Sequence, residues 1–385
     1  MSSIYLQLAV GGSVILISIL SVLCNTFFVK KSILKKDRDV KSDENIKQDL
    51  HHRKISVVIT VNDEAEELSK SLPLWLTQEY SDYEVIVVVD KRNTESEDII
   101  KRLDSHDHLY TTYIPQTSRY MSRKKLSITL GVKASHNEWI VLTEPSVEPP
   151  SRTWLAYFSS YLDDKHTAIL GMTQYDDDAS DFKHFEQLHT TLRIIKDTRN
   201  GKAARTNMPL IAIRKSIFLS QHGFRGNQKY LRGEYDFLIN KYGSRSLVVD
   251  APELICKQYN PTPKMWRNLH IFYQETRKHL NGLFAYKWKY RLEQLLLHLS
   301  IVASVVTIAV AISRNFYLLL GMAIVALMSI VALRTMTTRR TLNRFGLNIP
   351  YWKLPFYDIS LVWRDLLWRI RYLKADSYDF ISHKI

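Results

Sequence analysis

The chain has 385 residues and a formal net charge of +14, which is enough length for one large domain with appendages. The positive charge is uneven: residues 55–259 contain 26 Lys and Arg against 28 Asp and Glu, whereas residues 260–385 contain 18 against 6. Those later cations flank apolar segments, where anionic lipid attracts them, so the composition indicates a membrane surface and argues against nucleic acid. Two cysteines, Cys24 and Cys256, exclude a disulfide framework.

Three apolar segments are long enough to cross a membrane. Residues 1–29 carry no charged side chain, and residues 294–313 and 315–333 are two further uncharged runs separated by Arg314. A helix of about 20 apolar residues spans a hydrocarbon core roughly 30 Å thick. The alternatives are a cleaved signal peptide for the first segment and buried soluble helices for the other two. The first segment lacks Lys or Arg at its amino end and exceeds an ordinary signal-peptide core, so we predict three spans.

Charge placement predicts the orientation of these helices. Basic residues follow the first and third segments, namely Lys30, Lys31, Lys35, Lys36, Arg38, Arg334, Arg339, Arg340 and Arg344. The positive-inside rule therefore places the amino terminus outside and the region from residue 54 to about 291 in the cytoplasm. The expected protein is a multi-pass protein of the cytoplasmic (inner) membrane. It has a polar tether at 30–54, a two-helix hairpin at 292–334 and a cytoplasmic tail at 335–385, in which the arginine-interrupted apolar segment 355–373 predicts an interfacial helix.

The cytoplasmic region alternates strands and helices. The run Ile55–Val61 is almost continuously β-branched, as expected of a strand that is covered on both faces. Strands that alternate with helices predict parallel βαβ units and an α/β, doubly wound sheet. The predicted strands are 55–61, 83–90, 109–114, 139–142, 168–172, 210–213 and 247–249, and the helices are one carrying Leu68 to Leu76, 94–103, 122–134, 182–196 and 234–242.

Polar side chains follow three of these strands. Asp63 and Glu64 come after the first strand, Asp90 ends the second, and Glu144 follows the strand at 139–142. Ligands of open α/β sheets bind at the carboxyl ends of the strands, where acids accept hydrogen bonds from ribose hydroxyls. The alternative is that each acid is an ordinary cap or turn former, and in particular that Glu144 and Ser146 cap a helix beginning near Ser151.

Together these segments resemble the nucleotide-sugar half of family 2 glycosyltransferases. The resemblance covers roughly residues 55–154, through Leu72–Tyr80, Tyr83–Asp90, Arg123–Gly131 and the turn beginning at Leu142. The metal-binding turn of that family usually reads Thr-Asp-Ala-Asp, which is Thr-Glu-Pro-Ser here, and Lys91 stands where the family often has a second acid.

The resemblance implies a GT-A-type domain over residues 55–259 that binds a nucleotide sugar, by resemblance a UDP-linked one. It also implies Mg²⁺ or Mn²⁺ bridging the diphosphate, because hard cations take oxygen ligands. Glu144 and Ser146 are the expected metal ligands, with Glu148 compensating if the loop folds back. The expected donor-binding residues are Thr60, Asp63, Glu64, Asp90 and Lys125.

The segment Arg232–Phe237 resembles the part of the family that carries the general base. A base must be a carboxylate or imidazole within hydrogen-bond reach of the acceptor hydroxyl. Tyr235 occupies the matching position and is a poor base, so Asp236, or second Glu234, is the expected base. The alternative is that both acids complement the dipole of the helix that they begin.

The juxtamembrane segment 260–291 resembles the amphipathic segment of membrane-bound family members. By that resemblance Gln274, Arg277, Lys278, His279 and Trp266 contact the diphosphate or the acceptor. The guanidinium fork of arginine suits a diphosphate. The alternative is that these side chains anchor the chain at the lipid surface.

The resulting hypothesis is an inverting glycosyltransferase that moves a sugar to a membrane-associated, lipid-linked glycan in the assembly of envelope polysaccharide. The alternative is a catalytically inactive relative that binds a nucleotide sugar or a partner enzyme as a scaffold. The oligomeric state stays open.

Overall fold

The computed structural model describes residues 2–29, 53–91, 93–115, 121–198 and 202–382. Nearly all of the predicted tether at 30–54 lies outside them. The chain divides into two compact units, each described by itself below. The helical unit comprises residues 1–34, 181–193 and 282–367, and the α/β unit comprises residues 35–180, 194–281 and 368–385.

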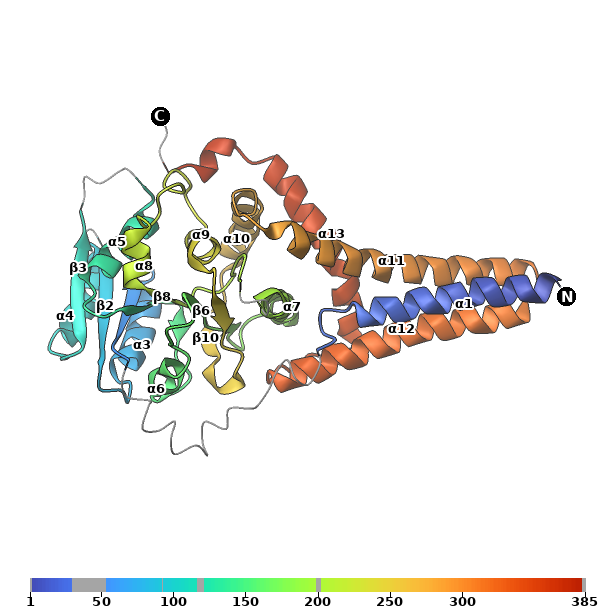
Figure 1. Ribbon diagram of the computed structural model, residues 1–385, viewed down its shortest axis with the longest axis horizontal. Helices are drawn as coiled ribbons and strands as arrows, with labels where there is room; N and C mark the ends of the chain where they lie inside the picture. Colours follow the sequence, from blue (N-terminus) through green and yellow to red (C-terminus); the bar gives the residue numbers. More distant parts are fainter. Residues whose placement is uncertain (1, 30–52, 92, 116–120, 199–201, 383–385) are drawn as a thin grey trace. The chain divides into compact units, whose positions relative to one another are not determined.

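The first half of the α/β unit is a parallel sheet with a helix between successive strands (Figure 1). Its strand order is β3-β2-β1-β4, and β1 pairs in parallel with β2 and β4, so that Ile55 lies opposite both Tyr83 and Trp139. This register brings the carboxyl ends of β1, β2 and β4 to one edge. The predicted α/β class and these elements are confirmed. Their bounds are β1 (Ile55–Thr60), α3 (Ala65–Leu76), β2 (Tyr83–Asp90), α4 (Thr94–Leu103), β3 (Leu109–Ile114), α5 (Arg123–Ala134) and β4 (Trp139–Thr143).

A close approach between α5 and β1 determines how α5 packs on the sheet. A Cβ atom on Gly131 would lie 2.3 Å from Cγ1 of Val58 and 3.1 Å from Cγ2 of Val88, so only glycine lets this helix pack on the buried strands. Ser122 caps the other end of α5, where its hydroxyl accepts from the amide of Lys125 at 3.4 Å. The basic first turn of α5 is thereby held at the carboxyl edge of the sheet.

The second half of the sheet is not parallel throughout. β8 runs antiparallel to both β4 and β6, and β6 is parallel to β9, so the described residues form a mixed seven-stranded sheet. The predicted parallel βαβ units thus make up the first half of the sheet, and β8 adds an antiparallel strand beside β4. A second sheet has the order β5-β10-β7. The remaining elements of this unit are β5 (Val147–Glu148), α6 (Trp154–Ser159), β6 (Ala168–Leu170), β7 (Thr173–Tyr175), β8 (Ile211–Arg214), α8 (Lys215–Ser220), α9 (Glu234–Tyr242), β9 (Ser246–Val248), η2 (Pro252–Leu254), β10 (Cys256–Gln258), α10 (Pro263–Thr276) and η4 (Ser377–Phe380).

The helical unit contains three helices apolar and long enough to cross a membrane among the described residues, as predicted. They are α1 (Ser2–Leu23), α11 (Leu283–Ser313) and α12 (Tyr317–Arg344), and the last two extend well beyond the uncharged runs at 294–313 and 315–333. The start of α1 lies beside the turn that joins α11 to α12 (Figure 1). The unit also includes α7 (Asp181–Thr198) as far as Arg193, η3 (Tyr351–Lys353), and α13 (Leu354–Leu373) as far as Leu367.

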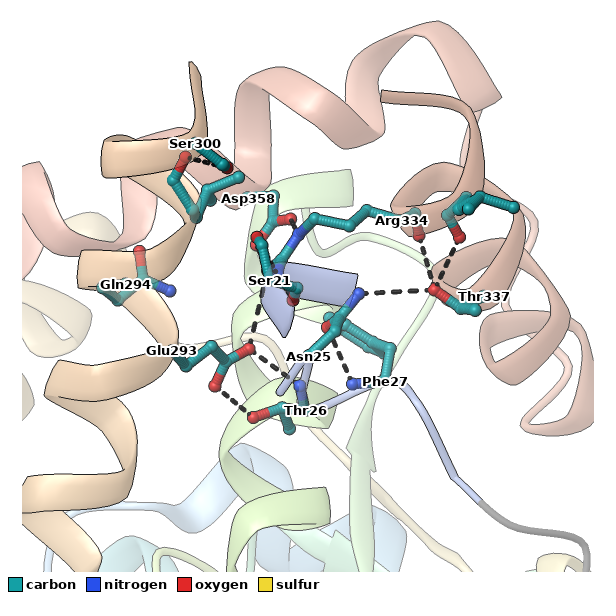
Figure 2. Close-up of polar contacts among 12 residues, drawn as sticks. Ser21, Asn25, Thr26, Phe27, Glu293, Gln294, Ser300, Arg334, Thr337 and Asp358 are labelled. Atoms are coloured by element: carbon teal, nitrogen blue, oxygen red, sulfur yellow. Dashed lines mark hydrogen bonds and ion pairs between the residues drawn. The ribbon is translucent and has the colours of Figure 1, made fainter. Parts of the chain in front are cut away.

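A buried polar network joins the helices of this unit (Figure 2). Arg334 on α12 donates to both carboxylate oxygens of Asp358 on α13, at 2.7 and 3.0 Å, and to the carbonyl of Ser21 on α1 at 2.6 Å. Glu293 on α11 accepts from the amide and the hydroxyl of Thr26, at 2.8 and 2.6 Å. Arg334 was expected to be one of several cations that face the lipid surface. It is instead buried and internally paired.

Candidate functional site

A cavity of about 600 Å³ lies beside the carboxyl ends of β1 and β2. Asn62 and Asp63 line it from the first strand end, and Asp90 and Asn93 from the second. Asn93 ties the two ends together, because its amide nitrogen donates to the carbonyl of Asp90 at 2.8 Å and its side chain donates to the carbonyl of Asn62. The other lining residues are Thr94, Glu95, Ile114 and Arg123.

Asp90 has a basic partner that also lines this cavity. Arg123, the first residue of α5, forms an ion pair with it, and the Asp90 side chain is only 13% exposed. Glu64 instead turns back on its own loop, where it accepts from the amide of Asn62 at 2.8 Å. Burial raises the pKa of Glu64 against the opposing charge of Lys124. Thr60 is buried at the end of β1, where its hydroxyl lies close to that of Tyr235.

Glu144 also has a basic partner. Lys124 pairs with it, and the two side chains are 11% and 20% exposed, respectively. The capping alternative for the turn is wrong, because α6 begins at Trp154 and no side chain caps it.

The rest of the turn is held by the second sheet. The carbonyl of Ser146 accepts from the amide of Tyr259 at 2.9 Å. Glu148 does not fold back toward Glu144, because β5 holds it beside the hydroxyl of Tyr259 and 3.8 Å from the ammonium of Lys257. Glu148 therefore does not compensate for Ser146.

Lys125 has a different environment from Lys124. Its ammonium group donates to the carbonyls of Asn227 and Tyr230, in the loop that leads into α9, and the residue is fully buried. Burial lowers the pKa of Lys125 to about 8. Successive helical residues point about 100° apart, so one turn of α5 directs Lys124 to Glu144 and Lys125 to this loop. Lys125 was expected to bind the donor, but the structure gives it a positioning contact instead.

α9 begins with three polar residues, Glu234, Tyr235 and Asp236. Gly233 precedes it with φ of 88°, and a Cβ atom there would lie 2.6 Å from Thr276 on α10, so the start of α9 packs directly against the end of α10. Asp236 is 5% exposed and accepts from the amide of Thr206 at 2.9 Å. Burial raises the pKa of Asp236 to about 6, although Arg205 and Arg277 oppose that rise.

The neighbours of Asp236 on α9 face the turn after β4. Tyr235 lies with its ring centroid 5.4 Å from the ammonium of Lys124. Burial, with the charges of Glu144 and Glu234, raises the pKa of Tyr235 well above its usual value, so it cannot serve as a base. Glu234 is 4% exposed, and its Oε1 has no hydrogen-bond partner among the described residues.

The structure separates the five residues expected from the juxtamembrane segment. Arg277, just after α10, is close enough to Asp236 to influence its charge, and Gln274 lies half-buried one turn earlier. The other three contact the C-terminal segment or their own helix. Trp266 packs edge-on against Trp368 at 5.4 Å. Lys278 bonds the hydroxyl of Tyr372 and lies 3.7 Å from Glu275, and His279 pairs with Glu275 at 2.8 Å.

Comparison with known proteins identifies the domain that holds these residues. The family model described as "Glycosyl transferase family 2" matches residues 56–220. The chain carries a family 2 glycosyltransferase domain. No curated protein sequence matches it. The solved mannosyltransferase PcManGT from Pyrobaculum calidifontis, in complex with GDP-Man and Mn²⁺, is similar at 16% identity and a TM-score of 0.50, over 85% of this chain and 98% of that one. The solved structure of S. aureus TarS 1-349 in complex with UDP-GlcNAc is 12% identical, with a TM-score of 0.42, over 77% of this chain and 93% of that one.

The likeness to PcManGT agrees with the predicted GT-A-type fold, and the family match makes this domain a glycosyltransferase domain. The family match covers β1 to α8, which includes Asp90, Arg123, Lys124 and Glu144. It ends before α9 and α10, so the assignment of Asp236 rests on the geometry of this chain alone.

The glycosyltransferase domain does not offer an evident site for a divalent ion. No group of three or more His, Cys, Asp or Glu side chains is placed to hold a metal among the described residues. Of the two expected ligands, Glu144 is already paired with Lys124 and Ser146 offers only a neutral hydroxyl. Mg²⁺ and Mn²⁺ are held mainly by carboxylates together with the phosphates of the substrate. The donor set present therefore does not fit the metal that the family resemblance implied.

Two site residues of the glycosyltransferase domain, Arg123 and Lys124, were not predicted as such. Their signal was present in the sequence, because Arg123, Lys124 and Lys125 form a basic first turn in a helix, where the helix dipole favours acids. A run of cations at that position indicates nearby anionic groups. The sequence does not show which of them faces the strand ends.

Proposed function

We propose that the protein is a membrane-anchored inverting glycosyltransferase that transfers a sugar from a nucleotide-sugar donor to an acceptor carried on a membrane lipid. A lipid-linked glycan in envelope polysaccharide assembly is the acceptor class we favour, and a UDP-linked sugar is the first donor to test. One observation carries the proposal: in a family 2 domain, Asp90 at the end of β2 and its partner Arg123 on α5 line a cavity, and Glu144 after β4 pairs with Lys124, the next residue of α5.

The donor fits the edge of the sheet. A cavity of about 600 Å³ falls in the size range of small-molecule sites. Asp63, Asp90 and Asn93 supply acceptors and donors for a nucleobase and ribose, in the place where α/β sheets bind nucleotides. Arg123 lines this cavity and Lys124 follows it on α5, so we assign the neutralisation of the diphosphate to these two cations.

The acceptor hydroxyl needs a base, and Asp236 fits that role. Its pKa of about 6 makes it a carboxylate at neutral pH that still has useful affinity for a proton. In a single displacement, the acceptor oxygen attacks the anomeric carbon, the bond from that carbon to the diphosphate oxygen breaks, and Asp236 takes the hydroxyl proton. Arg277 balances the charge of Asp236 before transfer. Glu234 is the second candidate for the base.

The lipid acceptor and the orientation are supported by the helical unit. Its three helices are candidates to cross a membrane among the described residues, and the start of α1 lies at the same end of the bundle as the α11–α12 turn. That arrangement agrees with an outside amino terminus, a glycosyltransferase domain in the cytoplasm and an inner-membrane location. The charged segment at 30–54 then connects α1 to the domain.

The test is turnover by the purified full chain in lipid nanodiscs. Release of nucleoside diphosphate and transfer of labelled sugar into the lipid fraction are measured with several UDP- and GDP-sugars. We expect acceptor-dependent release with at least one donor, lost in Asp236→Asn. Turnover that survives in both Asp236→Asn and Glu234→Gln would remove the proposed base.

A second function, that of an inactive scaffold, is favoured by one specific observation. Tyr235 occupies the place where the family has its base, and its raised pKa keeps it protonated. A scaffold binds nucleotide sugar and releases no product with any donor and lipid acceptor tested.

A further inference from the structure

The first turn of α5 carries more positive charge than its position favours. The amino end of a helix has a partial positive charge that stabilises acids and disfavours cations. Arg123, Lys124 and Lys125 nevertheless occupy it, and the helix is 12 residues long. Lys125 is used to hold the loop before α9. Arg123 and Lys124 instead face the acids at the strand ends.

Buried polar groups lie close to the pair of Lys124 and Glu144 and to Tyr235 beside it. Within the described residues, the hydroxyl of Thr143, which precedes Glu144, and Oε1 of Glu234, which precedes Tyr235, have no hydrogen-bond partner, and both residues are at least nine-tenths buried. Tyr235 lies next to Lys124, and its hydroxyl is near Glu144 and Thr60. Buried polar groups are nearly always paired, so unpartnered groups next to this ion pair favour a polar ligand that completes them.

We propose that Lys124, assisted by Arg123, provides the positive charge that a divalent ion would otherwise bring to the donor diphosphate, so that this site binds and activates its donor without a metal. The inference rests on the proposed function and specifies how its donor is held. When the anomeric C–O bond breaks, its electron pair stays on the departing diphosphate oxygen. The ammonium of Lys124 and the guanidinium of Arg123 neutralise that charge, while the acceptor proton goes to Asp236.

Glu144 has a defined part in this arrangement. It is the counter-ion of Lys124 before the donor binds, and it holds the ammonium group in place beside Tyr235. A diphosphate competes with Glu144 for Lys124. This predicts that neutralising Glu144 strengthens binding of the diphosphate, whereas loss of a metal ligand would weaken it. The two accounts give opposite signs for one substitution.

The experiment is calorimetric titration of the full chain in detergent with UDP and with GDP, in EDTA and again in Mn²⁺ or Mg²⁺. We expect one nucleoside diphosphate to bind in EDTA as tightly as it does with the metal. Lys124→Gln should weaken that binding by roughly tenfold or more, because charge-assisted hydrogen bonds contribute about 1.5–3 kcal/mol. Lys124→Arg should retain it. Glu144→Gln should tighten binding in EDTA.

A matched control lies on the same helix. Lys133 is in the last turn of α5 and exposed, so Lys133→Gln removes one positive charge without touching the site and should leave affinity unchanged. Gel filtration and thermal unfolding confirm that each variant is folded.

Three results would overturn the proposal. Binding that requires the metal, or that Glu144→Gln abolishes, overturns the metal-free site and leaves the proposed donor class intact. Equal affinity of Lys124→Gln and Lys133→Gln also removes Lys124 from the site. Absence of binding of UDP, GDP and their sugars in either buffer, by a folded protein, overturns the proposed function itself.

Discussion

Arg334→Met is expected to destabilise the helical unit by about 3–5 kcal/mol, the usual cost of removing one partner of a buried ion pair. Arg334 is 3% exposed and donates to both oxygens of Asp358 as well as to the carbonyl of Ser21. It also lies 3.7 Å from Glu293. Interhelical hydrogen bonds in membranes average only about 0.6 kcal/mol. Most of the cost therefore comes from leaving the two carboxylates buried without their cation.

Thermal unfolding of the detergent-solubilised chain, followed by tryptophan fluorescence, measures this effect. A loss of this size should lower Tm by roughly 5 °C or more. Arg340→Met is the matched control, because Arg340 is on the same helix and exposed, and it should unfold like the wild type. The double variant Arg334→Met/Asp358→Leu should recover stability relative to Arg334→Met, since apolar replacements of buried pairs are well tolerated. An Arg334→Met variant as stable as Arg340→Met, or a double variant no better than the single one, would refute this reasoning.

Three further predictions concern the α/β unit. Burial raises the pKa of Asp236 to about 6, so kcat/KM for transfer should rise with pH through about 6 and then level off. The pKa of Asp236 is higher in the folded protein than in the unfolded chain, so wild-type stability falls as the pH rises toward 6. The Tm of the wild type minus the Tm of Asp236→Asn should therefore decrease over this pH range. A Tm difference that does not change with pH would contradict the burial of this carboxylate. Lys125→Met should lower the free energy of unfolding by about 1–3 kcal/mol, because two carbonyls lose their hydrogen-bond donor. If Lys125→Met and Lys133→Met have the same free energy of unfolding, Lys125 has no positioning role. Lys278→Ala should reduce thermal stability slightly and leave the affinity for UDP or GDP unchanged in titration, because Lys278 contacts Glu275 and Tyr372.

The parallel half of the sheet was predictable because its strands are buried on both faces. A continuous β-branched run such as Ile55–Thr60 is typical of a strand that is covered on both faces. The strand at 83–90 and the helix at 94–103 have the predicted bounds. The antiparallel direction of β8 was not predictable. It is four residues long, and a short apolar run contains no information about which way it pairs.

The site prediction did not identify the ion-pair partners of its acids, because those partners lie far away in the sequence. Asp90 and Glu144 were chosen from their positions at strand ends, but their partners, Arg123 and Lys124, lie 33 and 20 residues away. The choice between Lys124 and Lys125 depends on the rotation of α5 against the sheet, which Gly131 fixes. Arg334 was interpreted as a surface charge because its partner Asp358 lies on another helix.

The most direct test of the account is an experimental structure of the full chain with UDP or GDP bound in EDTA. We expect the base and ribose in the cavity beside Asp90 and Asn93, and a diphosphate oxygen within hydrogen-bond distance of the ammonium of Lys124. A nucleotide bound elsewhere, or a Lys124–Glu144 pair that stays closed with the diphosphate directed away from it, would contradict the account.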